Sequence, residues 1–201
     1  MYEKLEIPVK EEIEIINRKK PRVSTQKYKP YEADETLVPP MACFGEGYRF
    51  YSTGLTHNEM GYPDMSVQTQ DKLVRRLCDK IRKNTKKITM TEETMTEDCE
   101  ILVVAYGVTS RSATTAVQMA RNQGIKAGLL RLISLWPFPD WKIAEVANNV
   151  KGVVVAEMNY GQLVREVESS VKPLPVEFIP KLGENPPSPE EILTKIRRLA
   201  Q

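Results

Sequence analysis

The chain has 201 residues, of which 41% are hydrophobic and 28% are charged, a composition typical of a globular protein of one or two domains. Its net charge of +2 gives no reason to expect binding to nucleic acid, and its apolar runs are too short to span a membrane. Three widely spaced cysteines, Cys43, Cys78 and Cys99, and an N-terminus without the apolar segment of a signal peptide predict a cytoplasmic protein with unpaired thiols.

Residues 1–65 contain prolines throughout and show little helical periodicity. Residues 12–17 are a candidate strand. Because proline fixes φ and removes a backbone donor, we expect residues 1–65 to be an extended, looped arm that packs on another domain. We expect no core of its own in this segment, and the domain on which it packs is either the later domain of this chain or one that is absent.

Within this arm, residues 44–63 combine four glycines and several aromatic residues with Arg49, His57 and Glu59. Long structured loops are often functional, so these three residues are candidates for an interface or a ligand loop. The alternative is a clamp that holds two domains together, with its glycines in turns. His57 is the only histidine of the chain, which argues against a metal site built on several histidines.

We predict a helix and a linker over residues 66–97. Ser66 is a candidate N-cap for a helix over residues 66–87, and residues 88–97 are polar. The apolar residues at helical spacing, which we expect to face inward, are Leu73, Val74, Leu77, Cys78 and Ile81.

Residues 98–201 alternate between strand and helix patterns. The predicted strands are residues 100–106, 127–133, 152–157 and 175–179. Thr109 or Ser110 is expected to cap the first predicted helix. The next two helices begin at Pro139 and Asp140 and at Gly161, and the last begins at a capping box formed by Ser188 and Glu191. Gly124 is expected to follow the end of the first of them. This order predicts a three-layer α/β domain with a mostly parallel sheet and helices on both faces.

Each of these helices has apolar residues at helical spacing that we expect to face the sheet. They are Ala113, Ala116, Val117 and Ala120; Trp141, Ala144, Ala147 and Val150; Leu163, Val164, Val167 and Val171; and Ile192, Leu193, Ile196 and Leu199.

The usual catalytic motifs are absent from the sequence. There is no Gly-x-Gly-x-x-Gly after the first strand, no phosphate-binding P-loop, no Gly-x-Ser-x-Gly and no Cys-x-x-Cys. We therefore predict no catalytic, cofactor-binding or metal-binding residue in this chain.

Two polar segments at predicted strand ends remain as candidate sites. The first contains Gly107, Ser110 and Arg111, where helix amides and a guanidinium favour an anion, although a capped turn explains the same residues. The second contains Glu157, Asn159 and Gln162. These side chains suit contact with a partner chain or a ligand, or capping of the helix that follows.

Several motifs resemble those of a known family, in family order along nearly the whole chain. They are residues 104–107 (VAYG) with 111–113 (RSA), 135–139 (LWPFP), 155–159 (VAEMN) with 161–163 (GQL), 15–21 (IINRKKP), 39–49 (PPMACFGEGYR) and 53–63 (TGLTHNEMGYP). The chain resembles the α subunit of the 2-oxoacid:ferredoxin oxidoreductases, and the last three motifs resemble its 2-oxoglutarate branch.

The resemblance implies a domain like the C-terminal domain of transketolase over residues 98–201, preceded by the arm of residues 1–65 as a remnant of the preceding domain. It implies that thiamine diphosphate, Mg²⁺ and an iron–sulfur cluster belong to the complex and are held outside this chain. The implied partners are a pyrimidine-binding domain and the β, γ and δ subunits, with ferredoxin and CoA as partners of the complex. The chain is then a non-catalytic structural and assembly part that is inactive alone. The alternative function is a regulatory domain that binds a nucleotide, CoA or another anion.

Overall fold

The computed structural model describes residues 6–201, so residues 1–5, the start of the predicted arm, lie outside the described residues. The chain forms two compact units, which comprise residues 1–84 and residues 85–201. In the part that is described, no helix is both long enough and apolar enough to cross a bilayer.

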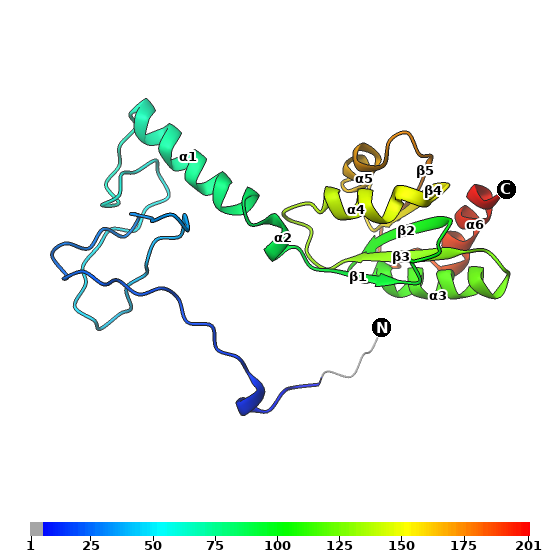
Figure 1. Ribbon diagram of the computed structural model, residues 1–201, viewed down its shortest axis with the longest axis horizontal. Helices are drawn as coiled ribbons and strands as arrows, with labels where there is room; N and C mark the ends of the chain where they lie inside the picture. Colours follow the sequence, from blue (N-terminus) through cyan, green and yellow to red (C-terminus); the bar gives the residue numbers. More distant parts are fainter. Residues whose placement is uncertain (1–5) are drawn as a thin grey trace. The chain divides into compact units, whose positions relative to one another are not determined.

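The second unit is a three-layer α/β domain, as the sequence predicts (Figure 1). Its strands are β1 (Thr91–Thr94), β2 (Ile101–Tyr106), β3 (Ala127–Leu132), β4 (Gly152–Glu157) and β5 (Val176–Pro180). Its helices are α2 (Thr85–Ile88), α3 (Thr109–Asn122), α4 (Asp140–Val146), α5 (Val164–Val171) and α6 (Pro189–Ala200), with a 3₁₀ turn, η2, at Ala147–Asn149. The sheet order is β1-β3-β2-β4-β5. Strands β2 to β5 are parallel, and β1 pairs with β3 in the antiparallel direction.

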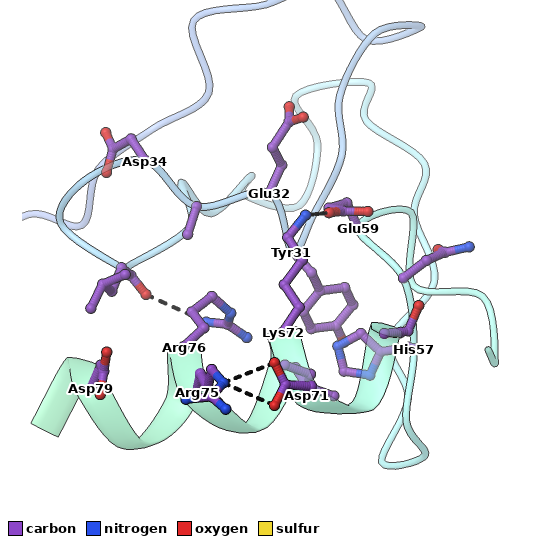
Figure 2. A pocket seen from close by; sticks show the side chains of 15 residues that line it. Tyr31, Glu32, Asp34, His57, Glu59, Asp71, Lys72, Arg75, Arg76 and Asp79 are labelled. Atoms are coloured by element: carbon purple, nitrogen blue, oxygen red, sulfur yellow. Dashed lines mark hydrogen bonds and ion pairs between the residues drawn. The ribbon is translucent and has the colours of Figure 1, made fainter. Parts of the chain in front are cut away.

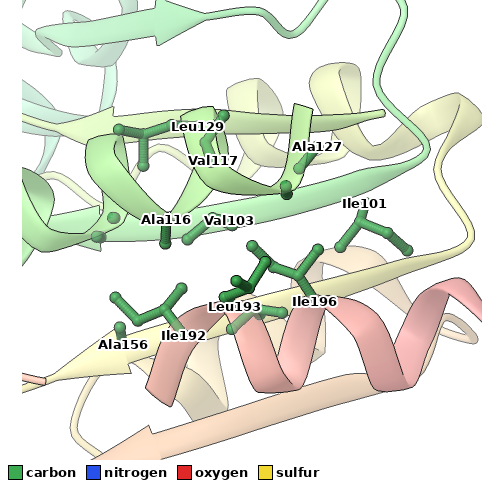
Figure 3. Packing of buried hydrophobic residues seen from close by; sticks show 14 of the residues in the cluster. Ile101, Val103, Ala116, Val117, Ala127, Leu129, Ala156, Ile192, Leu193 and Ile196 are labelled. Carbon is green, nitrogen blue, oxygen red and sulfur yellow. The ribbon is translucent and has the colours of Figure 1, made fainter. Parts of the chain in front are cut away.

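The central strands are apolar at most positions because helices cover both faces of the sheet. In β2, Ile101 and Val103 belong to the cluster beneath α3 and α6, whereas Leu102 and Val104 belong to the cluster beneath α4 and α5. Figure 3 shows the first cluster, with Ile196 of α6 facing the sheet. Because successive side chains of a strand point to opposite faces of the sheet, one apolar run contributes to both cores.

The predicted polar linker at residues 88–97 is wrong, because it contains the edge strand β1. Its sequence, Thr-Glu-Glu-Thr, has no apolar alternation, since an edge strand of this kind is held by its ladder and by charge pairs. Glu92 lies opposite Arg131 of β3, and their side chains form an ion pair of 3.0 Å.

One predicted N-cap and one predicted helix start are also wrong. Neither Thr109 nor Ser110 caps α3: the N-cap is Val108, and the Thr109 hydroxyl donates instead to the carbonyl of Tyr106 at 2.5 Å. Helix α5 begins at Val164 rather than Gly161, whose φ of +97° is not helical.

The predicted inward face that begins in α4 is wrong at Ala144, whose place is taken by Ile143, and confirmed at Ala147 and Val150. Ala144 is exposed, and the buried positions are Ile143, Ala147 and Val150, which are spaced i, i+4 and i+7. The capping box of Ser188 and Glu191 is confirmed.

The first unit contains helix α1 (Val67–Arg82) and the looped arm. Ser66 caps α1 as predicted, by accepting from the backbone N–H of Thr69 at 3.3 Å. The predicted helix over residues 66–87 is interrupted, however, because α1 ends at Arg82 and the short α2 begins at Thr85. The candidate strand at residues 12–17 is absent, and a 3₁₀ turn, η1, at Lys10–Glu12 precedes extended chain.

The expected burial of the apolar face of α1 is not found. No residue of α1 is buried, and Val74 and Leu77 are each 43% exposed. The arm packs instead against another side of this helix, where Lys72 and Arg76 lie.

Candidate functional site

The carboxyl ends of β2 and β4 meet at the point where the order of the sheet reverses. The chain leaves β2 toward β3 on one side and leaves β4 toward β5 on the other. In open α/β sheets this is the usual position of a ligand crevice. Tyr106 ends β2 and Glu157 ends β4, so two of the polar side chains of the sheet edge lie here.

Glu157 is fully buried, and its carboxylate accepts hydrogen bonds from its own loop. Oε2 accepts from the backbone N–H of Leu163 at 2.9 Å, and Oε1 accepts from that of Val164 at 2.9 Å. Oε2 also accepts from the Tyr106 hydroxyl at 3.3 Å and from Asn159 Nδ2 at 2.9 Å. A buried carboxylate therefore caps the first turn of α5, where the helix dipole favours a negative charge.

Asn159 completes this network and shapes the loop. Its Oδ1 accepts from the backbone N–H groups of Gly161 at 2.8 Å and of Gln162 at 3.0 Å, while its Nδ2 donates to the Tyr106 hydroxyl at 2.7 Å. The side chain of Gln162 is exposed and takes no part in the network. Burial, and then the charge of Glu157, raise the pKa of Tyr106 above its usual value, which keeps the hydroxyl protonated as a donor.

The turn after β2 brings Gly107 and Ser110 to the same edge. Gly107 has a φ of +54°, a left-handed conformation that suits glycine. Ser110 is buried, and its hydroxyl has no hydrogen-bond partner among residues 6–201. Arg111 is exposed on the first turn of α3. Anion binding at this turn stays a prediction.

The arm and α1 line an open-sided hollow of about 590 Å³ in the first unit. Figure 2 shows the His57 ring beside that of Tyr31, and the two centroids lie 4.0 Å apart. The His57 Nδ1 atom is 2.6 Å from the carbonyl oxygen of Leu55. Glu59 forms an ion pair with Lys72, whose hydrogen-bonded ammonium holds the pKa of Glu59 below its usual value.

The structure thus brings two of the three predicted arm residues together. Arg49 lies apart from His57 and Glu59, on a smaller hollow of about 240 Å³ lined largely by aromatic side chains. Sequence reasoning missed Tyr31, Lys72 and Arg76, which line the larger hollow. The charged face of the helix pattern was visible in the sequence, but nothing local indicates that the arm folds onto that face.

The glycines of the arm serve turns at least in part, as the clamp interpretation expects. Gly61 has a φ of +86°, and a Cβ atom there would lie 2.8 Å from the carbonyl oxygen of Tyr51. The backbone N–H of Gly61 also donates to the carbonyl of Asn58 at 3.0 Å.

The side chains of the described residues do not offer a site for a metal ion or an iron–sulfur cluster. Among residues 6–201, no three His, Cys, Asp or Glu side chains gather closely enough to hold one. Cys43 is exposed, Cys78 is partly exposed and Cys99 is buried, and none of them forms a disulfide. We derive no chemical step through such a group.

Comparison with known proteins connects both units to one family. Residues 99–192 match the family model of the pyruvate:ferredoxin oxidoreductase core domain II. The 2-oxoglutarate synthase subunit KorA of Methanothermobacter thermautotrophicus is 42% identical over 99% of this chain and 53% of its own length. KorA of Methanocaldococcus jannaschii is 48% identical over 90% of this chain and 48% of its own length. The chain belongs to the 2-oxoacid:ferredoxin oxidoreductase family.

A solved structure of the family agrees. A 2-oxoglutarate:ferredoxin oxidoreductase from Magnetococcus marinus, with 2-oxoglutarate, coenzyme A and succinyl-CoA bound, matches 96% of this chain with a TM-score of 0.84 and 27% identity. The match covers 34% of that oxidoreductase chain. The present chain spans about half the length of the curated KorA relatives that it matches.

Proposed function

We propose that the chain is a structural and assembly part of the α subunit of a 2-oxoglutarate:ferredoxin oxidoreductase. The observation that carries the proposal is 42% identity to KorA along 99% of this chain, over only 53% of that relative. The complete enzyme oxidatively decarboxylates the 2-oxoacid and yields an acyl-CoA, CO₂ and reduced ferredoxin. Thiamine diphosphate, Mg²⁺ and an iron–sulfur cluster supply that chemistry, and other domains or subunits hold them.

The bonding at the strand ends supports a structural role for this chain. The carboxylate of Glu157 and the amide of Asn159 are bonded within the chain, so they stabilise the loop before α5. To bind a substrate, these groups would first have to break their internal hydrogen bonds, which costs free energy.

An uncovered apolar stripe on α1 supports a role in assembly. Val67, Val74 and Leu77 recur at i, i+7 and i+10, and Val67 is 79% exposed. An exposed apolar stripe of this kind is typical of an interaction surface. We assign it to the remainder of the α subunit, because the KorA relatives have about twice the length of this chain.

The finer assignments follow from the same proposal. The pyrimidine-binding domain and the β subunit are the partners nearest to this chain, and the γ and δ subunits join them in the complex. We place the complex in the cytoplasm, an assignment that the unpaired Cys43, Cys78 and Cys99 support.

Co-expression with the pyrimidine-binding half of the subunit and with the β subunit tests the proposal. We expect the chain to co-elute with them in size-exclusion chromatography, and the Val74→Glu/Leu77→Glu variant to elute alone. Gln68→Glu is the matched control, because Gln68 is also exposed on α1 but lies outside the stripe. This control should still associate.

Activity provides the second arm of this test. The assembly should reduce a dye acceptor with 2-oxoglutarate, thiamine diphosphate and CoA, whereas the chain alone should not. A monodisperse chain that never binds these partners, or turnover by the chain alone, would overturn the proposal.

A further inference from the structure

The hollow between α1 and the arm contains a cation without a counter-ion. Arg76 projects from α1 toward the arm loop and lines the hollow (Figure 2). Its Nη1 donates to the carbonyl oxygen of Leu37 at a long 3.4 Å, and within residues 6–201 no carboxylate lies at ion-pair distance from it. A guanidinium carries five N–H donors, so most of its hydrogen-bonding capacity is unused here.

Partial burial makes this arrangement costly. Arg76 is partly buried, and burial lowers the pKa of its guanidinium below the usual value. A charged group removed from water without a partner loses hydration that nothing replaces. An anion with two oxygens in one plane, which could accept two parallel N–H bonds, would restore that loss.

The other charges of the hollow are already balanced. Its other two cations are paired, Lys72 with Glu59 and Arg75 with Asp71, the latter at 2.8 Å. The remaining acids of the lining are paired as well, Asp34 with Lys19, Glu32 with Lys29 and Asp79 with Lys83. Among the described residues, Arg76 is therefore the cation of this lining that has no carboxylate paired with it.

We propose that this hollow binds a small-molecule anion whose carboxylate or phosphate group is held by Arg76. Its volume of about 590 Å³ lies within the range of small-molecule sites, roughly 300–1,000 Å³. The rings of Tyr31 and His57, which lie side by side in Figure 2, line the same hollow as the guanidinium. A surface ion pair would need only the guanidinium, whereas a hollow lined by charged and aromatic side chains suits a ligand that has a body as well as an anionic group.

Isothermal titration calorimetry on the full chain tests the site, with inorganic phosphate, pyrophosphate and malonate as probes. We expect saturable binding of at least one probe, and the probe that binds identifies the group as phosphate or carboxylate. Arg76→Ala should abolish the heat of binding. Arg76→Lys should weaken binding about tenfold or more, because lysine keeps the charge but loses the planar pair of donors.

Arg22→Ala is the matched control, since Arg22 is an exposed cation of the same unit that does not line the hollow. It should bind as the parent does. Circular dichroism and elution volume establish that each variant folds. Failure of all three probes to bind in the millimolar range, or equal binding by a folded Arg76→Ala variant, would overturn the site. The outcome is independent of the assembly test, which concerns Val74 and Leu77.

Discussion

The buried carboxylate of Glu157 allows a quantitative test of how the candidate site is held. We predict that Glu157→Gln destabilises the second unit strongly. The carboxylate accepts four hydrogen bonds, three at Oε2 and one at Oε1. In either orientation of the glutamine amide, its NH₂ group takes the place of one carboxylate oxygen. The NH₂ group is a donor, and it then faces the N–H or O–H donors that bonded to that oxygen. In the better orientation it keeps the three bonds of Oε2 and faces the backbone N–H of Val164.

The magnitude follows from the bonds that are lost. A hydrogen bond to a charged group contributes about 1.5–3 kcal/mol, and an unsatisfied buried donor costs a further amount of about 1–3 kcal/mol. Because the loop can relax, we expect a loss of about 2–4 kcal/mol in the free energy of unfolding. At about 4 °C per kcal/mol for a unit of this size, Tm should fall by about 8–16 °C.

Tryptophan fluorescence is the suitable assay, because both tryptophans of the chain, Trp136 and Trp141, lie in the second unit. Thermal and urea unfolding followed by this signal report on that unit separately from α1 and the arm. Glu166→Gln is the matched control: Glu166 lies on the same helix but is exposed, so its change should stay within about 0.5–1 kcal/mol. If Glu157→Gln were as stable as the parent, the carboxylate would not be capping α5, and a role in binding a partner would become the better explanation.

Three further predictions concern the same unit and use the same fluorescence assay. Gly128→Ala should destabilise it by about 1–3 kcal/mol, because a Cβ atom there would lie 2.6 Å from a backbone oxygen and 2.9 Å from a side-chain carbon; stability equal to the parent would contradict this packing. Ser188→Ala removes the N-cap of α6 and should cost about 1 kcal/mol, whereas the exposed Ser169→Ala should change little; equal effects of the two would argue against the cap. The Arg121 guanidinium holds the pKa of Asp98 below its usual value of about 3.9. This pair therefore contributes stability above about pH 4 and loses that contribution as the pH falls through the folded pKa, so Asp98→Asn should show a shallower decline in acid than the parent.

The candidate site was only partly predictable from the sequence. Glu157 and Asn159 were found because polar residues directly after a buried strand are visible in the pattern. Their partner Tyr106 was not singled out, since it lies 51 residues from Glu157 and only the adjacency of β2 and β4 brings the two together. The same holds for Arg76, whose position in the hollow depends on a contact with Leu37, 39 residues away.

By itself, the sequence determined the strands β2 to β5, the helices between them and the two-sided burial of the sheet. These follow from local periodicity, from β-branched runs and from caps such as Ser66 and Ser188, which act over a few residues. Only the tertiary structure decided that β1 joins the sheet as an antiparallel edge strand and that the arm packs on the charged side of α1. The physical reason is that a polar edge strand and a charged helix face carry no apolar periodicity of their own. Their partners, β3 and the loop near Leu37, are distant in sequence and are chosen by hydrogen bonds and charge pairs.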